Sequence, residues 1–161
     1  MMPSLEKKSG QKILIVDDDQ NEMRSLVIGL RLEGFDAEGT TSGATALAML
    51  GRDNYSAMII DLMMPEMNGL QLARAVRSTF PAVTTLLMSA YHLSPVQLAR
   101  ADTGVVGFVP KPFSFEELVR FLHLKLNPNT CEENAGSPGA TDSGLYTPID
   151  VATVARSRES K

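Results

Sequence analysis

The chain has 161 residues, a formal net charge of −4, 43% hydrophobic residues and one cysteine. This length and apolar content predict one folded domain with its own core. A single cysteine excludes an intrachain disulfide and a cysteine-rich metal site, and the negative charge argues against direct DNA binding. The apolar stretches are too short for a membrane span and no signal-peptide core follows the first lysines, so we expect a cytoplasmic location.

Short β-rich runs alternate with helical patterns over residues 12–126, which is typical of βαβ units. The expected strands are residues 12–16, 35–40, 57–61, 83–88 and 105–109. The expected helices begin near Asp19, Ser42, Asn68, Ser94 and Ser114. Asp19 and Ser114 precede Glu22 and Glu117 by three residues, which predicts a capping box at each helix start. The pattern as a whole predicts an α/β fold with a doubly wound, five-stranded parallel sheet and five helices.

The two ends of the chain differ in composition from the part between them. Residues 1–11 form a polar leader, and residues 127–161 are rich in Gly, Pro, Ser, Thr, Asn and Asp. Such a composition favours a flexible tail. The tail is also too short for an ordinary DNA-binding domain that folds alone, so we expect no output domain.

Polar side chains follow four of the predicted strands. Asp17 and Asp18 follow the first strand, and Asp61 closes the third. Ser89 follows the fourth strand, and Lys111 comes shortly after the fifth. The carboxyl ends of parallel strands converge at one edge of a doubly wound sheet, so we expect these five side chains to lie together.

This set of side chains predicts a particular chemistry. Clustered carboxylates repel one another, and a bound cation relieves the repulsion. Oxygen ligands suit Mg²⁺, and no histidine or cysteine in the pattern favours zinc. Lys111 and Ser89 would complete a pocket for a tetrahedral dianion. Phosphoryl transfer is therefore indicated, with Asp61 as the best nucleophile because it stands alone, whereas Asp17 and Asp18 are neighbours suited to holding metal.

Four blocks occur in the order found in the receiver domain of two-component response regulators, which the chain resembles over residues 12–126. The blocks are Ile15-Val16-Asp17-Asp18, Asp61-Leu62-Met63-Met64-Pro65-Glu66-Met67-Asn68-Gly69, Met88-Ser89-Ala90 and Lys111-Pro112-Phe113. The resemblance implies a flavodoxin-like sheet with strand order 2-1-3-4-5. It also implies a phosphoprotein of a phosphorelay that takes its phosphoryl group from a sensor histidine kinase or a histidine phosphotransfer protein.

The same resemblance assigns roles around the metal. Asp61 would be the phosphoacceptor and would also contact Mg²⁺. Asp17 and Asp18 would be the Mg²⁺ carboxylates, and the main-chain carbonyl of Met63 would be a further ligand.

A second group of roles concerns the switch. Ser89 and Lys111 would bind the phosphoryl group, and the Lys111–Pro112 bond would be cis. Phe108 would be the aromatic switch that turns inward when Ser89 moves. A phosphoryl group adds about two negative charges and three acceptor oxygens, so its arrival would alter the face made by the fourth helix, fifth strand and fifth helix. A downstream protein would read that face.

The last helix offers a possible contact for a homodimer or a target. Its buried stripe is expected at Phe115, Leu118, Val119, Leu122 and Leu126. Phe121 lies at the edge of this stripe and Leu124 points away from it. These two side chains would supply an exposed apolar contact, or they are single exposed apolar residues of the kind that most surfaces carry.

Two other functions remain open from the sequence. Asp17 and Asp19 form a DxD pair that resembles the motif of a small Mg²⁺-dependent haloacid-dehalogenase-like phosphatase. This alternative leaves Asp61 without a role. The other is a phosphorylation-independent receiver that only binds proteins. No enzymatic activity is expected beyond autophosphorylation and autodephosphorylation.

Overall fold

The computed structural model describes residues 10–91, 94, 96–97 and 104–127. Most of the predicted leader, the tail beyond Asn127 and most of the helix expected from Ser94 lie outside the described residues. Five strands form one parallel sheet in the order β2-β1-β3-β4-β5, which confirms the predicted order. The strands are β1 (Lys12–Val16), β2 (Asp36–Thr40), β3 (Ala57–Asp61), β4 (Thr84–Ser89) and β5 (Gly107–Pro110).

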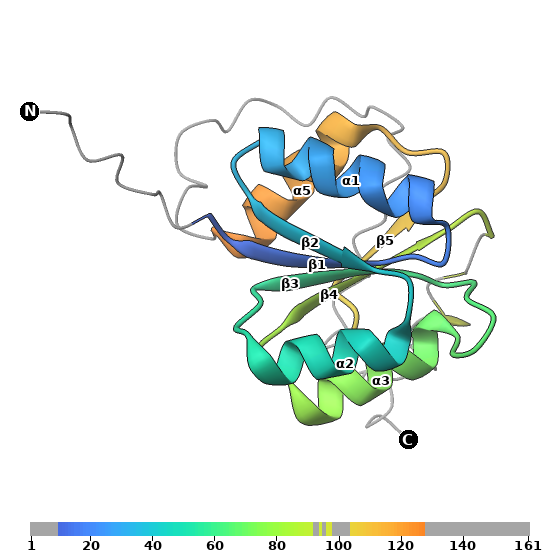
Figure 1. The fold of residues 1–161 in the computed structure, drawn as a ribbon. Helices are drawn as coiled ribbons and strands as arrows, with labels where there is room; N and C mark the ends of the chain where they lie inside the picture. Colours follow the sequence, from blue (N-terminus) through green and yellow to red (C-terminus); the bar gives the residue numbers. More distant parts are fainter. Residues whose placement is uncertain (1–9, 92–93, 95, 98–103, 128–161) are drawn as a thin grey trace, which may run out of the picture.

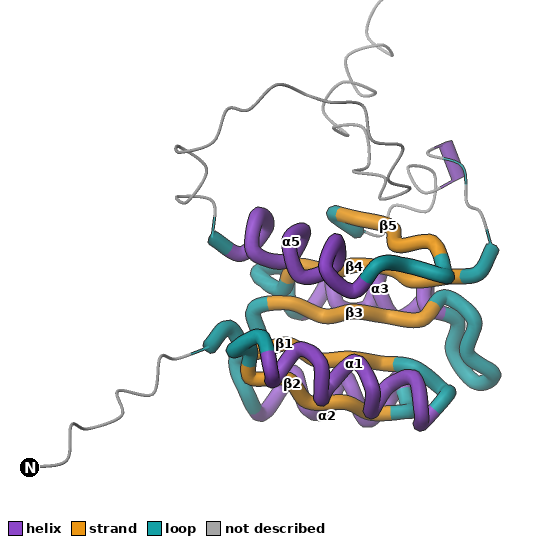
Figure 2. Tube along the Cα trace, turned by 90° about the horizontal axis from the view of Figure 1, so that it is seen from above, coloured by secondary structure: helices purple, strands orange, loops and turns teal. Residues whose placement is uncertain are grey.

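The described helices cover both faces of the sheet. Helices α1 (Gln20–Leu32) and α5 (Phe115–Leu126) lie on one face, and α2 (Gly43–Arg52) and α3 (Gly69–Thr79) lie on the other (Figure 1). The view from above shows the sheet between these two layers (Figure 2). The doubly wound α/β prediction is therefore confirmed. Within the described ranges, no helix has the length and apolar character needed to cross a membrane.

Strands β1 and β3 have the predicted bounds, and the bounds of the other three strands differ from the predicted ones by one or two residues. The largest shift is at β5, which begins at Gly107 instead of residue 105. Strand ends are the least sharply encoded part of an element, because a terminal residue has fewer ladder hydrogen bonds to hold it. Beyond β5 the pairing continues for one more residue, since the Lys111 amide donates to the Ser89 carbonyl at 2.8 Å.

Helix starts follow their capping residues, but neither predicted capping box is complete. At α5 the Ser114 side chain accepts from the Glu117 amide, without the return bond from the Glu117 side chain. The Asp19 side chain accepts from the amides of Asn21 and Glu22, as an N-cap should. The predicted capping box is nevertheless wrong at this helix. The Asp19 amide donates to Asp17, and the Glu22 carboxylate accepts a hydrogen bond from Lys111. The Glu22 side chain, which would have closed the box, thus binds Lys111 instead.

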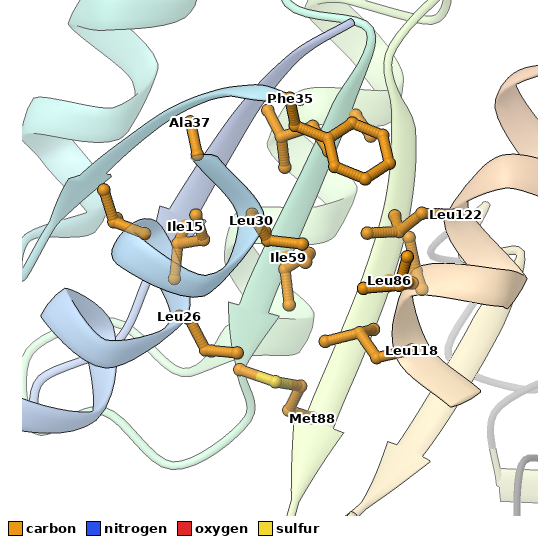
Figure 3. Packing of buried hydrophobic residues seen from close by; sticks show 14 of the residues in the cluster. Ile15, Leu26, Leu30, Phe35, Ala37, Ile59, Leu86, Met88, Leu118 and Leu122 are labelled. Atoms are coloured by element: carbon orange, nitrogen blue, oxygen red, sulfur yellow. The ribbon is translucent and has the colours of Figure 1, made fainter. Parts of the chain in front are cut away.

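Two hydrophobic layers hold the sheet between the helices. The first lies between the sheet and α1 with α5 (Figure 3) and contains Ile15, Leu26, Leu30, Phe35, Ile59, Leu86, Met88, Leu118 and Leu122. The second faces α2 and α3 and contains Leu14, Val16, Met58, Ile60, Leu72, Val76, Leu87 and Phe108. All five residues of β3 are buried, as expected for a central strand covered on both faces.

The predicted surface role of Phe121 is wrong, because its side chain is buried with 7% of its area exposed. The reason lies in β5: a Cβ placed on Gly107 would be 2.5 Å from the Phe121 Cζ atom. The ring occupies the space that a side chain at position 107 would fill. Leu124 remains 50% exposed, as expected.

Candidate functional site

The carboxyl ends of four strands bring the predicted residues to one edge of the sheet. Asp17 follows β1, Asp61 ends β3, Ser89 ends β4 and Lys111 follows β5. The register places Asp61 opposite Met88, the residue before Ser89. Backbone pairing therefore fixes the position of each side chain before any contact between the side chains themselves.

Three carboxylates meet at this edge. One oxygen from each of Asp17, Asp18 and Asp61 lies within 4.8 Å of the other two. Asp17 is fully buried and Asp61 is 8% exposed, whereas Asp18 is exposed to solvent. Hard oxygen donors on one side and open solvent on the other suit a cation that keeps several of its waters, which is the habit of Mg²⁺. The donor set therefore fits the predicted metal.

Backbone amides orient the two buried carboxylates. The Asp17 Oδ1 atom accepts from the Asp19 amide at 2.9 Å. The Asp61 Oδ1 atom accepts from the Met63 amide at 3.3 Å. Each carboxylate thus has one oxygen held by the following loop, which leaves the other oxygen for a cation or a reacting group.

Lys111 supplies the positive charge of the site. Its Nζ atom is 2.5 Å from Glu22 Oε2, 3.3 Å from Asp17 Oδ2 and 3.7 Å from Asp61 Oδ2. Its side chain is 18% exposed, so water screens these interactions only in part. One ammonium group therefore forms ion pairs with three carboxylates.

Burial has the largest effect on the pKa values of the two buried carboxylates. Burial raises the pKa of Asp17 to about 6, against the opposing effects of the Asp19 amide and of Lys111. Burial likewise raises the pKa of Asp61, and the charge of Asp18 adds to that rise. Burial alone would lower the pKa of Lys111, but Glu22, Asp17 and Asp61 together raise it. A second cation would satisfy carboxylates that one lysine cannot.

The switch residues predicted from the resemblance are also close to this edge or below it. Ser89 is 1% exposed, and its Oγ atom accepts from the Tyr91 amide at 2.9 Å. Phe108 is 2% exposed and packs in the layer that faces α2 and α3. The Lys111–Pro112 bond is cis, as predicted.

Two residues of the site were not predicted. Glu22 contacts Lys111 across 89 positions of sequence, and no local pattern signals such a pair. Gly69 does carry a signal, because it follows Asn68 at a helix start. A Cβ on Gly69 would lie 2.6 Å from the Asp61 carbonyl oxygen and 2.8 Å from the Leu62 Cα atom. Only glycine lets the start of α3 approach the end of β3 this closely.

Proteins of similar sequence identify the family of this chain. The sequence model described as the response regulator receiver domain matches residues 13–123. The response regulator MprA of Mycobacterium avium is 34% identical over 134 residues, which cover 83% of this chain and 59% of MprA. The chain thus spans about three fifths of the length of this curated relative.

Solved structures give the same picture. The response regulator TrrA of Thermotoga maritima, crystallised in complex with Mg²⁺-BeF, is 29% identical with a TM-score of 0.65, over 72% of this chain and 99% of that one. The chemotaxis response regulator CheY4 of Vibrio cholerae is 30% identical with a TM-score of 0.66, over 73% of this chain and 99% of CheY4. With the family model covering most of its length, this chain belongs to the response regulator receiver domain family.

Proposed function

We propose that this chain is a phosphorylation-dependent response regulator that accepts a phosphoryl group on Asp61 with the help of Mg²⁺. The observation that carries the proposal is the meeting of Asp17, Asp18 and Asp61 within 4.8 Å beside the Lys111 ammonium. The donor would be a phosphohistidine on a sensor histidine kinase or on a histidine phosphotransfer protein. The Mg²⁺-BeF bound in the T. maritima relative supports the choice of ligand.

The transfer itself requires little covalent work from the protein. The free Asp61 oxygen attacks phosphorus, an O–P bond forms, and the N–P bond of phosphohistidine breaks as the imidazole leaves and takes up a proton. Asp17 and Asp18, with the Met63 main-chain carbonyl, would hold the metal. Bound Mg²⁺ would neutralise charge on the phosphoryl oxygens. Lys111 would contact the same oxygens through its ammonium group.

The response would run through Ser89 and Phe108. Ser89 would donate its hydroxyl proton to a phosphoryl oxygen, whereas in this structure its Oγ atom accepts from the Tyr91 amide. Phe108 is already buried in this structure, so its contribution would be to follow Ser89 within that packed layer. The changed face of the fourth helix, β5 and α5 would bind a downstream protein or a second copy of the chain.

We place the receiver domain at residues 12–126, with a leader at 1–11 and a tail at 127–161. The end of α5 at Leu126 supports the second boundary. The match of the family model to residues 13–123 supports both.

The phosphatase alternative is less well supported, because the Asp19 side chain caps α1. Its Oδ1 atom accepts from the Asn21 and Glu22 amides as the cap of α1. These two hydrogen bonds direct the Asp19 side chain to the start of its own helix. Nothing in the geometry favours a DxD mechanism over an Asp61 acceptor.

Incubation with acetyl phosphate and Mg²⁺, followed by reductive trapping and mass spectrometry of the peptides, tests the proposal. We expect the label on Asp61 and none in Asp61→Asn, with Asp36→Asn, an exposed aspartate on β2, labelled like the wild type. Label on Asp17 would establish the phosphatase instead. Absence of label from the wild type would leave the phosphorylation-independent binding module.

A further inference from the structure

Lys111 is held by a carboxylate that does not belong to the acidic triad. Among the three carboxylates around the ammonium, Glu22 is the closest, at 2.5 Å, and Asp61 is the most distant, at 3.7 Å. A distance of 3.7 Å is too long for a hydrogen bond, whereas the Glu22 contact is a short, charge-assisted one. In this state Lys111 is bonded to α1 and to Asp17, and only lies near Asp61.

The local structure of α1 explains why Glu22 is available. A glutamate three residues after a cap normally returns to the backbone amide of the capping residue. Here the Asp19 amide already donates to Asp17 Oδ1 at 2.9 Å. The Glu22 carboxylate therefore has no cap to close, and it extends instead to Lys111 (the first turn of α1 begins beside the carboxyl end of β1 in Figure 1).

We propose that Glu22 is a positioning residue that competes with the phosphoryl group for Lys111 and so favours the unphosphorylated state. The inference rests on the proposed function, in which Lys111 contacts the phosphoryl group on Asp61. Phosphorylation then requires Lys111 to exchange its bond with Glu22 for one with the phosphoryl oxygens. The Glu22 side chain is 52% exposed, so solvent screens the pair and the effect is moderate.

The test uses Glu22→Gln, which keeps the size of the side chain and removes its charge. With saturating Mg²⁺, the acetyl phosphate concentration that gives half-maximal label on Asp61 should fall about two- to fivefold, the range expected for a partly exposed ion pair. Glu33→Gln is the matched control, because Glu33 is an exposed glutamate at the opposite end of the same helix. It should leave the half-maximal concentration unchanged.

Two further variants separate positioning from a general effect of charge. Glu22→Asp keeps the charge but shortens the side chain, so it should behave like Glu22→Gln if the bond to Lys111 is decisive. In a Lys111→Met background, Glu22→Gln should have no further effect on labelling. If Glu22→Asp behaves like the wild type, or if the effect persists without Lys111, the charge of Glu22 acts directly and the inference is overturned.

A spectroscopic measurement reports on the pair without phosphorylation. In metal-free protein with ¹⁵N-labelled lysine, the Lys111 ammonium resonance should shift in Glu22→Gln and stay in place in Glu33→Gln. An unshifted resonance in Glu22→Gln would overturn the inference. A shift together with no label on the wild type at any acetyl phosphate concentration would instead overturn the proposed function, and with it the competition for Lys111.

Discussion

Lys12 and Lys111 lie at opposite ends of the sheet, and each is close to more than one carboxylate. Lys12 begins β1 and is 3.6 Å from Glu38 and 3.4 Å from Asp53. Its Nζ atom also lies 4.9 Å from the centre of the Tyr55 ring. Lys111 faces Glu22, Asp17 and Asp61, and no aromatic ring of the described residues stacks on its ammonium group.

The two clusters differ in how their negative charge is balanced. Around Lys12, the Tyr55 hydroxyl donates a hydrogen bond to Glu38, and Asp53 is largely exposed to water. That cluster is complete with protein groups and solvent. Around Lys111, two carboxylates are buried and the pKa of one is raised to about 6. The carboxylates beside Lys12 are therefore neutralised or hydrated by groups already present. The buried carboxylates beside Lys111 would instead be neutralised by a bound cation.

The largest expected effect is on phosphorylation. Lys111→Met should lower the initial rate of Asp61 labelling by acetyl phosphate about 100-fold, because a preorganised charge that contacts the transferred group is lost. Lys12→Met removes the same charge at the other end of the sheet and should leave that rate within about twofold. A comparable loss in both variants would contradict the distinction between the two clusters. Quantitative mass spectrometry of the trapped peptide measures both rates.

Backbone packing should also differ between the two ends. Gly69→Ala should destabilise the protein by about 1–3 kcal/mol, because the new methyl group would overlap the Asp61 carbonyl and the backbone of Leu62. Gly51→Ala, near the carboxyl end of α2, meets nothing within 4 Å and should stabilise the helix by about 0.5–1 kcal/mol. Urea unfolding of both variants measures the difference. Equal changes would show that the start of α3 is less constrained than its contacts imply.

The third prediction concerns pH in the absence of metal. The pKa of Asp17 is raised from 3.8 to about 6 in the folded state. The folded protein therefore binds this proton more tightly, so the stability that Asp17 contributes is complete below about pH 4 and is lost as the pH rises through about 6. Asp17→Asn has no such proton to lose. In the presence of a chelator, its unfolding free energy relative to the wild type should rise by about 1–3 kcal/mol between pH 4 and pH 8. If the difference in unfolding free energy does not change over this pH range, the pKa of Asp17 is not raised.

Much of the site was predictable because it depends on strand ends. Asp17, Asp61, Ser89 and Lys111 each follow an apolar run, and the geometry of a parallel sheet brings such positions together without any knowledge of side-chain contacts. The fold followed from the same alternation of runs and helical patterns. The strand order came from the resemblance to the receiver family.

What could not be predicted depends on contacts between distant segments. Glu22 has the spacing of a capping box, but its carboxylate accepts a hydrogen bond from Lys111, which follows β5. Phe121 was assigned to the surface by helical periodicity, yet Gly107 leaves room for its ring. In both cases a local rule was overruled by a neighbour that only the folded structure reveals.

Two aromatic side chains of α5 pack directly against glycine residues of neighbouring elements. The Phe121 ring lies over Gly107 of β5, and a Cβ on Gly29 of α1 would come within 2.7 Å of the Phe115 ring. A rigid ring in a space of its own size cannot slide without a clash. A displacement of β5, the strand that carries Phe108 and leads into Lys111, would therefore press on α5 at Phe121, while Phe115 holds the start of the helix against α1.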